Sequence, residues 1–231
     1  YGDFGSSMVE GNFTQRWNPA HYQFVVDGSC QPTDLNQWMP SWWKGIWVDF
    51  NFTQDIPLGS FEIKGIWGEN STEAHTSGKV DSKDFSFRDM EFKNSAIEVS
   101  VDYNNTLVNC IELTHAEGTI SGSLKFPRRN SQSPYFLELE FNGDYPLEKG
   151  RNVLGETIKS QISELNASLI DCEVKGKIGR PDTSNPDHEI EIKISSAEDF
   201  QFKGVKIDEI KGLLSYRNNL TSGNFNQLDF A

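Results

Sequence analysis

Two nine-residue stretches, DFSFRDMEF at residues 84–92 and DFQFKGVKI at residues 199–207, share one pattern of apolar and polar residues. In both, apolar residues alternate with polar ones, and the parity of the alternation switches at FRDM and FKGV. Alternation with a period of two is typical of a β-strand buried on one face, and a switch of parity predicts a tight turn. We therefore expect two β-hairpins that turn at Arg88–Asp89 and Lys203–Gly204.

Other similar segments lie at nearly the same spacing. FEIKGIWG at 61–68 matches CEVKGKIG at 172–179, and DYNNTL at 102–107 matches SYRNNL at 215–220. The three offsets, 111, 115 and 113 residues, differ by amounts that short loop insertions produce. This spacing indicates a repeat of about 110 residues. We divide the chain into end strands of a preceding unit, a first unit and a truncated second unit, at residues 1–31, 32–152 and 153–231. Because the first residue is Tyr and the second unit is cut short, we expect a fragment of a longer chain.

The composition of the 231 residues also favours strands. Hydrophobic residues make up 36% of the chain, which is enough for a core, and Phe (16) and Gly (19) are frequent. The same alternation recurs along the chain, most clearly in EIEIKIS at residues 189–195. A sheet with one continuous apolar face must either cover that face with a second layer or curl around it. We predict an all-β fold made of antiparallel strands.

Two segments depart from the alternation and predict short helices. Leu154, Ile158, Ile162 and Leu165 fall at helical spacing, so residues 153–165 predict an amphipathic helix that packs on the sheet. The Trp-rich stretch at 30–50 contains two prolines, which predicts two short helices beginning near Thr33 and Ser41. Its tryptophans could pack on the sheet, contact a membrane interface or stack on sugars, and packing is the favoured interpretation because Lys44 is the stretch's only Lys or Arg.

Charge and motifs exclude several classes of function. The net charge of −13, from 34 acidic and 21 basic residues, argues against nucleic acid as a partner. Cys30, Cys110 and Cys172 lie far apart, the histidines are scattered, and no metal-binding or nucleotide-binding motif occurs. Cys172 takes the place of Phe61 in the other copy, which predicts that it packs as a small apolar residue. We expect no catalytic residues, no metal and no cofactor.

The pattern resembles a known family. SGKVDSKDFSFRDMEFKNSAIEVSVDYNNTLV at 77–108, followed by AEGTISGSL at 116–124, is similar to the repeating unit of AsmA- and TamB-like envelope proteins of diderm bacteria. The resemblance implies an elongated, curved antiparallel sheet whose stacked repeats, each with a short amphipathic helix, form a β-groove. It also implies a periplasmic location with an inner-membrane anchor in a missing N-terminal segment. The implied function is transport of phospholipid between the inner and outer membranes, with other envelope proteins as partners at the groove ends.

The resemblance implies a face that binds acyl chains, and it implies no catalytic residue. The expected lining residues are Phe61, Ile63, Phe85, Phe87, Phe92, Ile97, Val99, Val101, Val174, Phe200, Phe202, Ile207 and Leu214. The same face could instead be the closed core of a β-sandwich. Other readings are an extracellular adhesin or glycan-binding β-repeat module, a polysaccharide-active β-helix enzyme, and, from six Asn-x-Ser/Thr sequons, a glycosylated ectodomain.

Overall fold

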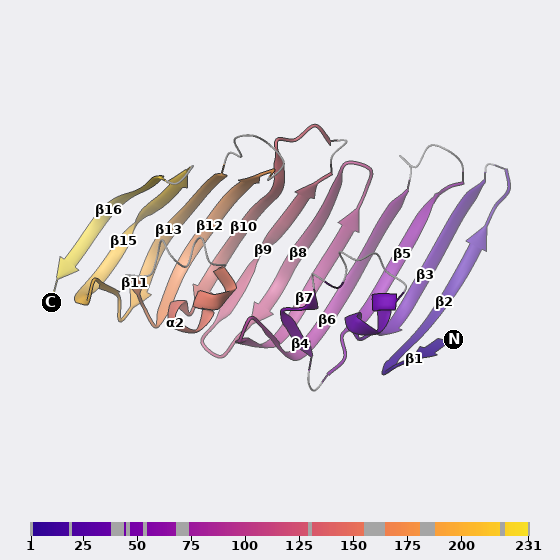
Figure 1. The fold of residues 1–231 in the computed structure, drawn as a ribbon, viewed down its shortest axis with the longest axis horizontal. Helices are drawn as coiled ribbons and strands as arrows, with labels where there is room; N and C mark the ends of the chain where they lie inside the picture. The colour runs from indigo at the N-terminus through magenta and orange to yellow at the C-terminus, as the bar shows by residue number, and fades with distance from the viewer. Residues whose placement is uncertain are drawn as a thin grey trace.

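In the computed structural model, one antiparallel sheet runs through the whole molecule (Figure 1). The structure describes residues 2–18, 20–37, 44, 47–52, 55–67, 74–128, 131–154, 165–180, 188–217 and 220–230. Most consecutive strands of these residues are direct neighbours in the sheet, as in a meander. The all-β prediction is confirmed.

The longer strands form the body of the sheet. They are β2 (Ser7–Gln15), β3 (His21–Ser29), β5 (Leu58–Ile66), β6 (His75–Phe87), β7 (Met90–Val101), β8 (Asn105–Thr114), β9 (Thr119–Pro127), β10 (Tyr135–Tyr145), β12 (Leu169–Gly179), β13 (His188–Glu198), β15 (Val205–Arg217) and β16 (Leu220–Phe230). Short strands pair at their ends: β1 (Gly2–Phe4) with β2, β4 (Phe50–Phe52) with β6, and β11 (Leu165–Asn166) with β14 (Gln201–Phe202), which pairs in turn with β15.

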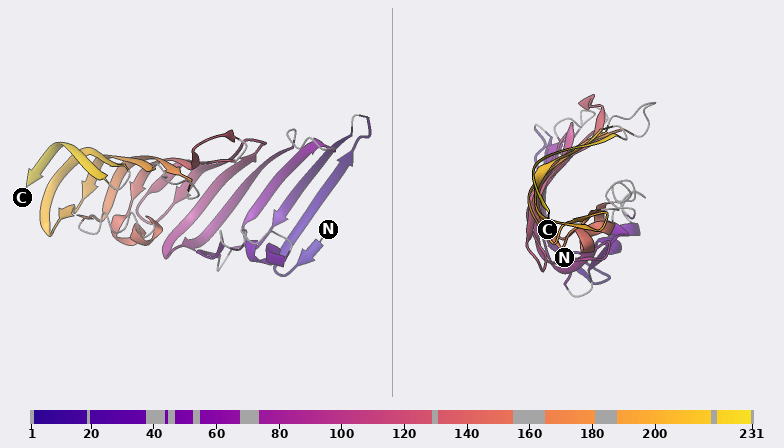
Figure 2. Two further views of the ribbon diagram at one scale, coloured as in Figure 1. Left: turned by 45° about the horizontal axis from the view of Figure 1, so that its top comes forward. Right: turned by 90° about the vertical axis from the view of Figure 1, so that its left-hand side faces the viewer.

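The sheet is long and curled. Seen end-on, it forms an open C, and the short helix α2 (Leu147–Gly150) lies on the inner side of the curve (Figure 2). The two chain ends lie at opposite ends of the long axis (Figure 1). Two further short helical segments are the 3-10 helices η1 (Pro32–Gln37) and η4 (Arg151–Leu154).

The two predicted hairpin turns are confirmed. Arg88 and Asp89 have φ angles of 46° and 69°, and Lys203 and Gly204 have 51° and 76°. Two successive positive φ values are the geometry of a type I′ turn, which matches the twist of the strands it joins. The hairpins differ in one respect, because Phe85 lies inside β6 whereas Phe200 lies between β13 and β14.

The predicted helix at 153–165 lies mostly outside the described residues, and both of its ends differ from the prediction. Leu154 closes η4, and Leu165 belongs to β11, where it pairs with Phe202. Pairing between distant strands has overridden the local helical spacing at Leu165.

The Trp-rich stretch begins with η1, and residues 38–43, including the expected second helix start at Ser41, lie outside the described residues. The ring of Trp47 lies 5.2 Å from that of Phe50 and 6.2 Å from that of Phe52. For Trp47, these contacts agree with packing on the sheet.

The turn geometry gives a first prediction. A Cβ atom added at Gly204 meets nothing within 4 Å, so the cost of Gly204→Ala comes from its positive φ alone. We expect a loss of about 1 kcal/mol in the free energy of unfolding, measured as a shift of the urea midpoint. Asp89→Gly, at φ 69°, is the control and should cause no loss. An unchanged midpoint for Gly204→Ala would contradict the turn assignment.

Candidate functional site

The strand register gathers apolar residues into rows on one face of the sheet. Directly opposed residues of an antiparallel pair project to the same face, so successive pairs define a row across the strands. One such row crosses from β2 to β13 without a polar side chain. This apolar row consists of Gly11, Val26, Phe61, Gly78, Val99, Val108, Leu124, Leu139, Gly176 and Ile190.

The neighbouring row, on the opposite face, is mostly polar and charged. This polar row consists of Glu62, Ser77, Ser100, Leu107, Lys125, Glu138, Lys177, Glu189 and Arg217. Opposed members form ion pairs, with 3.3 Å between Lys125 and Glu138 and 2.9 Å between Arg217 and Glu189. Each exposed pair contributes little to stability, but together they keep this face hydrated.

The apolar row lies on the inner side of the curve. Ile170 projects to the same face of β12 as Gly176, because the two residues are six positions apart, an even offset. Ile170 packs in one cluster with Leu147 of α2, and Figure 2 shows α2 inside the C. The polar row therefore faces outwards.

One side of the inner face is covered by short segments, which we call the ledge: β4, α2 and β11 with the adjoining Ala167. The first cluster under the ledge contains Leu147, Ala167, Ile170, Ile194, Phe200 and Ile207. The second contains Phe85, Met90, Phe92 and Ile120, with Phe50 and Phe52 of β4 packed against it. The ring of Phe52 stacks on that of Phe85 at 5.7 Å. These clusters form the closed core of the molecule.

Eleven of the thirteen predicted lining residues fall into two groups. Phe85, Phe92, Phe200 and Ile207 are only 6%, 5%, 2% and 6% exposed, and Phe87 packs beside them under the ledge. The second group projects to the inner face and stays partly exposed, up to 36% for Ile63; its members are Phe61, Ile63, Ile97, Val99, Val101 and Val174. The remaining two predicted residues are Phe202 and Leu214, whose side chains are not among those that the structure describes. The backbone of Leu214 is opposite Ile192.

Glycines shape the floor of the inner face. A Cβ atom at Gly78 would lie 2.2 Å from the ring of Phe61, and one at Gly122 would lie 2.6 Å from that of Phe141. The absence of side chains lets both rings lie against the backbone of the neighbouring strand. Phe141 and the remaining members of the apolar row are not among the predicted lining residues. The alternation in YFLELEFNG at 135–143 is the signal that identifies Leu139 and Phe141.

Hydrogen bonds fasten α2 to the sheet. The hydroxyl of Tyr145 donates to the carbonyl of Gly150, and Lys149 pairs with Glu117. The buried His115 bonds through Nε2 to the carbonyl of Asp144 at 2.7 Å, so Nε2 carries the hydrogen. Its Nδ1 is then free to accept the backbone N–H of Glu117 at 3.2 Å. These contacts hold the ledge at the β8–β9 turn.

The inner face offers little acid–base or metal chemistry. Burial raises the pKa of Cys172 to about 11, so this residue is a neutral thiol packed against the first cluster, as the sequence predicted. Cys30 and Cys172 are both free. Among the described residues, no group of three or more His, Cys, Asp or Glu side chains could hold a metal ion, and no helix is long and apolar enough to cross a membrane.

Comparison with models of protein families, with curated proteins and with solved structures finds no match to this chain. Any assignment of function therefore depends on the two faces of the sheet.

The division of the inner face predicts unequal effects of truncation. Phe85→Ala removes a ring from a closed cluster and should cost about 3–5 kcal/mol. Val99→Ala removes only partly buried methyl groups and should cost less than about 1.5 kcal/mol. Chemical denaturation of both variants measures the two losses in the free energy of unfolding. Equal losses would show that Val99 is as deeply packed as Phe85.

The ledge attachment predicts a dependence on pH. The hydrogen bond from Lys149 holds the pKa of Glu117 below its ordinary value of 4.5, so the pair stabilises the fold above that value. The contribution is lost as the pH falls through the lowered pKa. We expect the parent to be more stable than Glu117→Gln at pH 7, with the difference vanishing in acid. Urea unfolding from pH 7 to about 3 tests this, and a difference that persists unchanged in acid would contradict it.

Proposed function

We propose that this chain is a segment of a hydrophobic β-groove that spans the periplasm and carries phospholipid between the inner and outer membranes. The apolar row is the observation that supports this function. It crosses the sheet from β2 to β13 on the concave side, and its bulky members Phe61 and Val99 stay partly exposed. The charged side chains of the polar row face the opposite way.

The physical requirements of lipid transport fit such a face. An acyl chain that crosses water must be sheltered, because each exposed CH₂ group costs about 0.8 kcal/mol. Neighbouring strands lie about 4.8 Å apart, so a row from β2 to β13 extends over roughly 40 Å. This length exceeds the hydrocarbon thickness of a bilayer, about 30 Å. An acyl chain could therefore move along the row from strand to strand without leaving an apolar surface.

In this proposal the acyl path follows the accessible group of inner-face residues: Phe61, Ile63, Ile97, Val99, Val101 and Val174. The deeply buried group under the ledge stabilises the sheet and closes one side of the path. Lipid enters and leaves along the other side.

A repeat of about 110 residues would extend the path in one dimension. The two hairpins support this part of the proposal, because Asp84 and Asp199 both have positive φ, at 43° and 52°. The following Phe85 and Phe200 are both buried. We propose that further repeats, an inner-membrane anchor and envelope proteins at the groove ends complete the conduit.

Placing a charge on the path tests the function. Val99→Asp puts a carboxylate on the apolar row, whereas Ser100→Asp puts the same group on the outer face of the same strand. We expect Val99→Asp to fold, because the side chain is partly exposed, and to lose photo-crosslinking to acyl chains in cells. Ser100→Asp should crosslink like the parent.

Mass spectrometry of co-purifying lipids and circular dichroism melting complete the experiment. A folded Val99→Asp variant that still crosslinks would remove this row from the path. A parent protein that carries no phospholipid would contradict the proposed function itself.

A further inference from the structure

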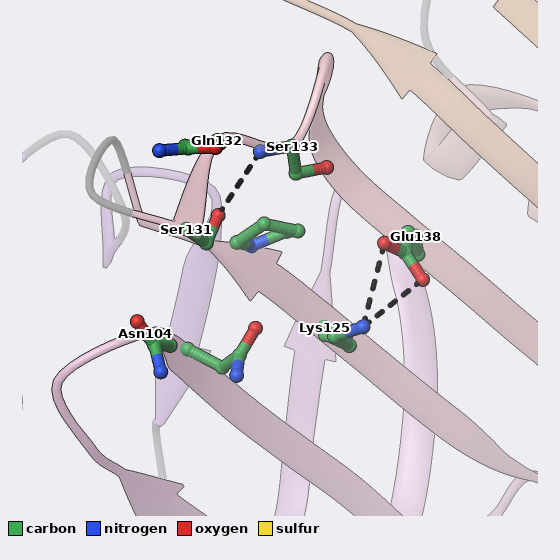
Figure 3. Close-up of a pocket in the computed structure, with 8 residues that line it drawn as sticks. Asn104, Lys125, Ser131, Gln132, Ser133 and Glu138 are labelled. Carbon is green, nitrogen blue, oxygen red and sulfur yellow. Dashed lines mark hydrogen bonds and ion pairs between the residues drawn. The ribbon is translucent and has the colours of Figure 1, made fainter.

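A polar pocket of about 350 Å³ lies on the outer face, where β9 ends and β10 begins (Figure 3). Lys125 and Glu138 of the polar row form one wall. Asn104, in the turn before β8, and Asn105, the first residue of β8, also line the pocket. The segment between β9 and β10 forms the opposite wall with Ser131, Gln132 and Ser133. The volume is at the small end of the range for ligand sites, roughly 300–1,000 Å³, and suits a ligand of one or two rings.

The wall between β9 and β10 is held in place by a side chain from another strand pair. Arg180, just beyond β12, donates hydrogen bonds to the carbonyls of Ser133 at 3.0 Å and Pro127 at 2.9 Å, and a longer one to Arg128. The hydroxyl of Ser131 donates to the carbonyl of Arg128 at 2.6 Å. The wall is therefore preorganised, which lowers the entropic cost of binding a ligand.

Three side-chain amides around this pocket have no intramolecular hydrogen bond within the described chain. They belong to Asn104, Asn105 and Gln132. The backbone φ of Gln132 is 58°, a conformation that residues other than glycine adopt at a cost. Each amide offers two donors and one acceptor, so the pocket presents both kinds of group to a ligand.

The charges in the pocket cancel each other. Lys125 and Glu138 lie 3.3 Å apart and are bonded to each other, so the wall has no net charge with which to attract an ion. A charged or zwitterionic ligand would have to break this pair. A neutral ligand rich in hydroxyl groups would bond to the amides and leave the pair intact.

We propose that this pocket binds a neutral saccharide unit. Sugar hydroxyls both donate and accept hydrogen bonds, as the three amides do, and a single ring fits the volume. The site is on the face opposite to the apolar row, so it does not depend on the lipid-transport proposal.

The experiment measures binding of glucose and N-acetylglucosamine to the whole chain by saturation-transfer difference NMR. We expect binding with a Kd of about 1 mM, typical of a small site with few contacts. Gln132→Gly removes one amide and relieves the positive φ, so the variant should fold and lose at least tenfold in affinity. Asp89→Gly, the same change at a positive-φ position remote from the pocket, is the matched control and should bind like the parent.

A second comparison separates a saccharide from a lipid headgroup. Tighter binding of sn-glycero-3-phosphoethanolamine than of either sugar would overturn the proposal. Unchanged sugar binding by Gln132→Gly, or no binding of either sugar by the parent, would also overturn it.

Discussion

In-register antiparallel pairing is the constraint on which this structure depends. Side chains alternate between the two faces of a strand, so a slip of one residue would exchange them. The pairs of β6 with β7 keep one register from Thr76–Val101 to Phe87–Met90. The same regularity from strand to strand aligns the apolar row on one face and the polar row on the other. Both the curled apolar surface and the hydrated outer surface therefore follow from the register.

Asp84 lies where β6 passes from the partly exposed part of the inner face to the part under the ledge. Its positive φ interrupts the alternation of β6, so Ser82 and Phe85 are both buried although they are three positions apart, an odd offset. Opposite it on β7, Lys93 and Asn94 are both exposed between the buried Phe92 and Ser95. The partly exposed residues of the inner face and the buried phenylalanines of the second cluster therefore lie on the same face of the sheet. They do so although, along β6 and β7, one set occupies odd positions where the other occupies even ones. The same kind of residue, Asp199, precedes the buried Phe200.

Much of the fold could be predicted from the sequence because its determinants are local. The turns at Arg88–Asp89 and Lys203–Gly204 follow from nine-residue patterns. Alternation identifies the face to which a residue projects but not what lies over that face. Phe85 and Val99 therefore looked equivalent, although β4, more than thirty residues upstream, covers only the first. The polar pocket could not be predicted either, because Arg180 reaches Ser133 across 47 positions.

The covered and the partly exposed parts of the inner face contribute unequally to stability. The partly exposed part contributes less to folding than its composition suggests, because less of its apolar area is removed from water. The two clusters under the ledge compensate for this smaller contribution to folding, because residues such as Phe200 and Ile194 are almost completely removed from water. The net charge of −13 opposes association, and the ion pairs Lys79–Glu98 and Lys175–Glu140 connect neighbouring strands on the outer face. A curled sheet of this kind can keep one apolar side open only because the ledge supplies the buried core and the outer face supplies the charge.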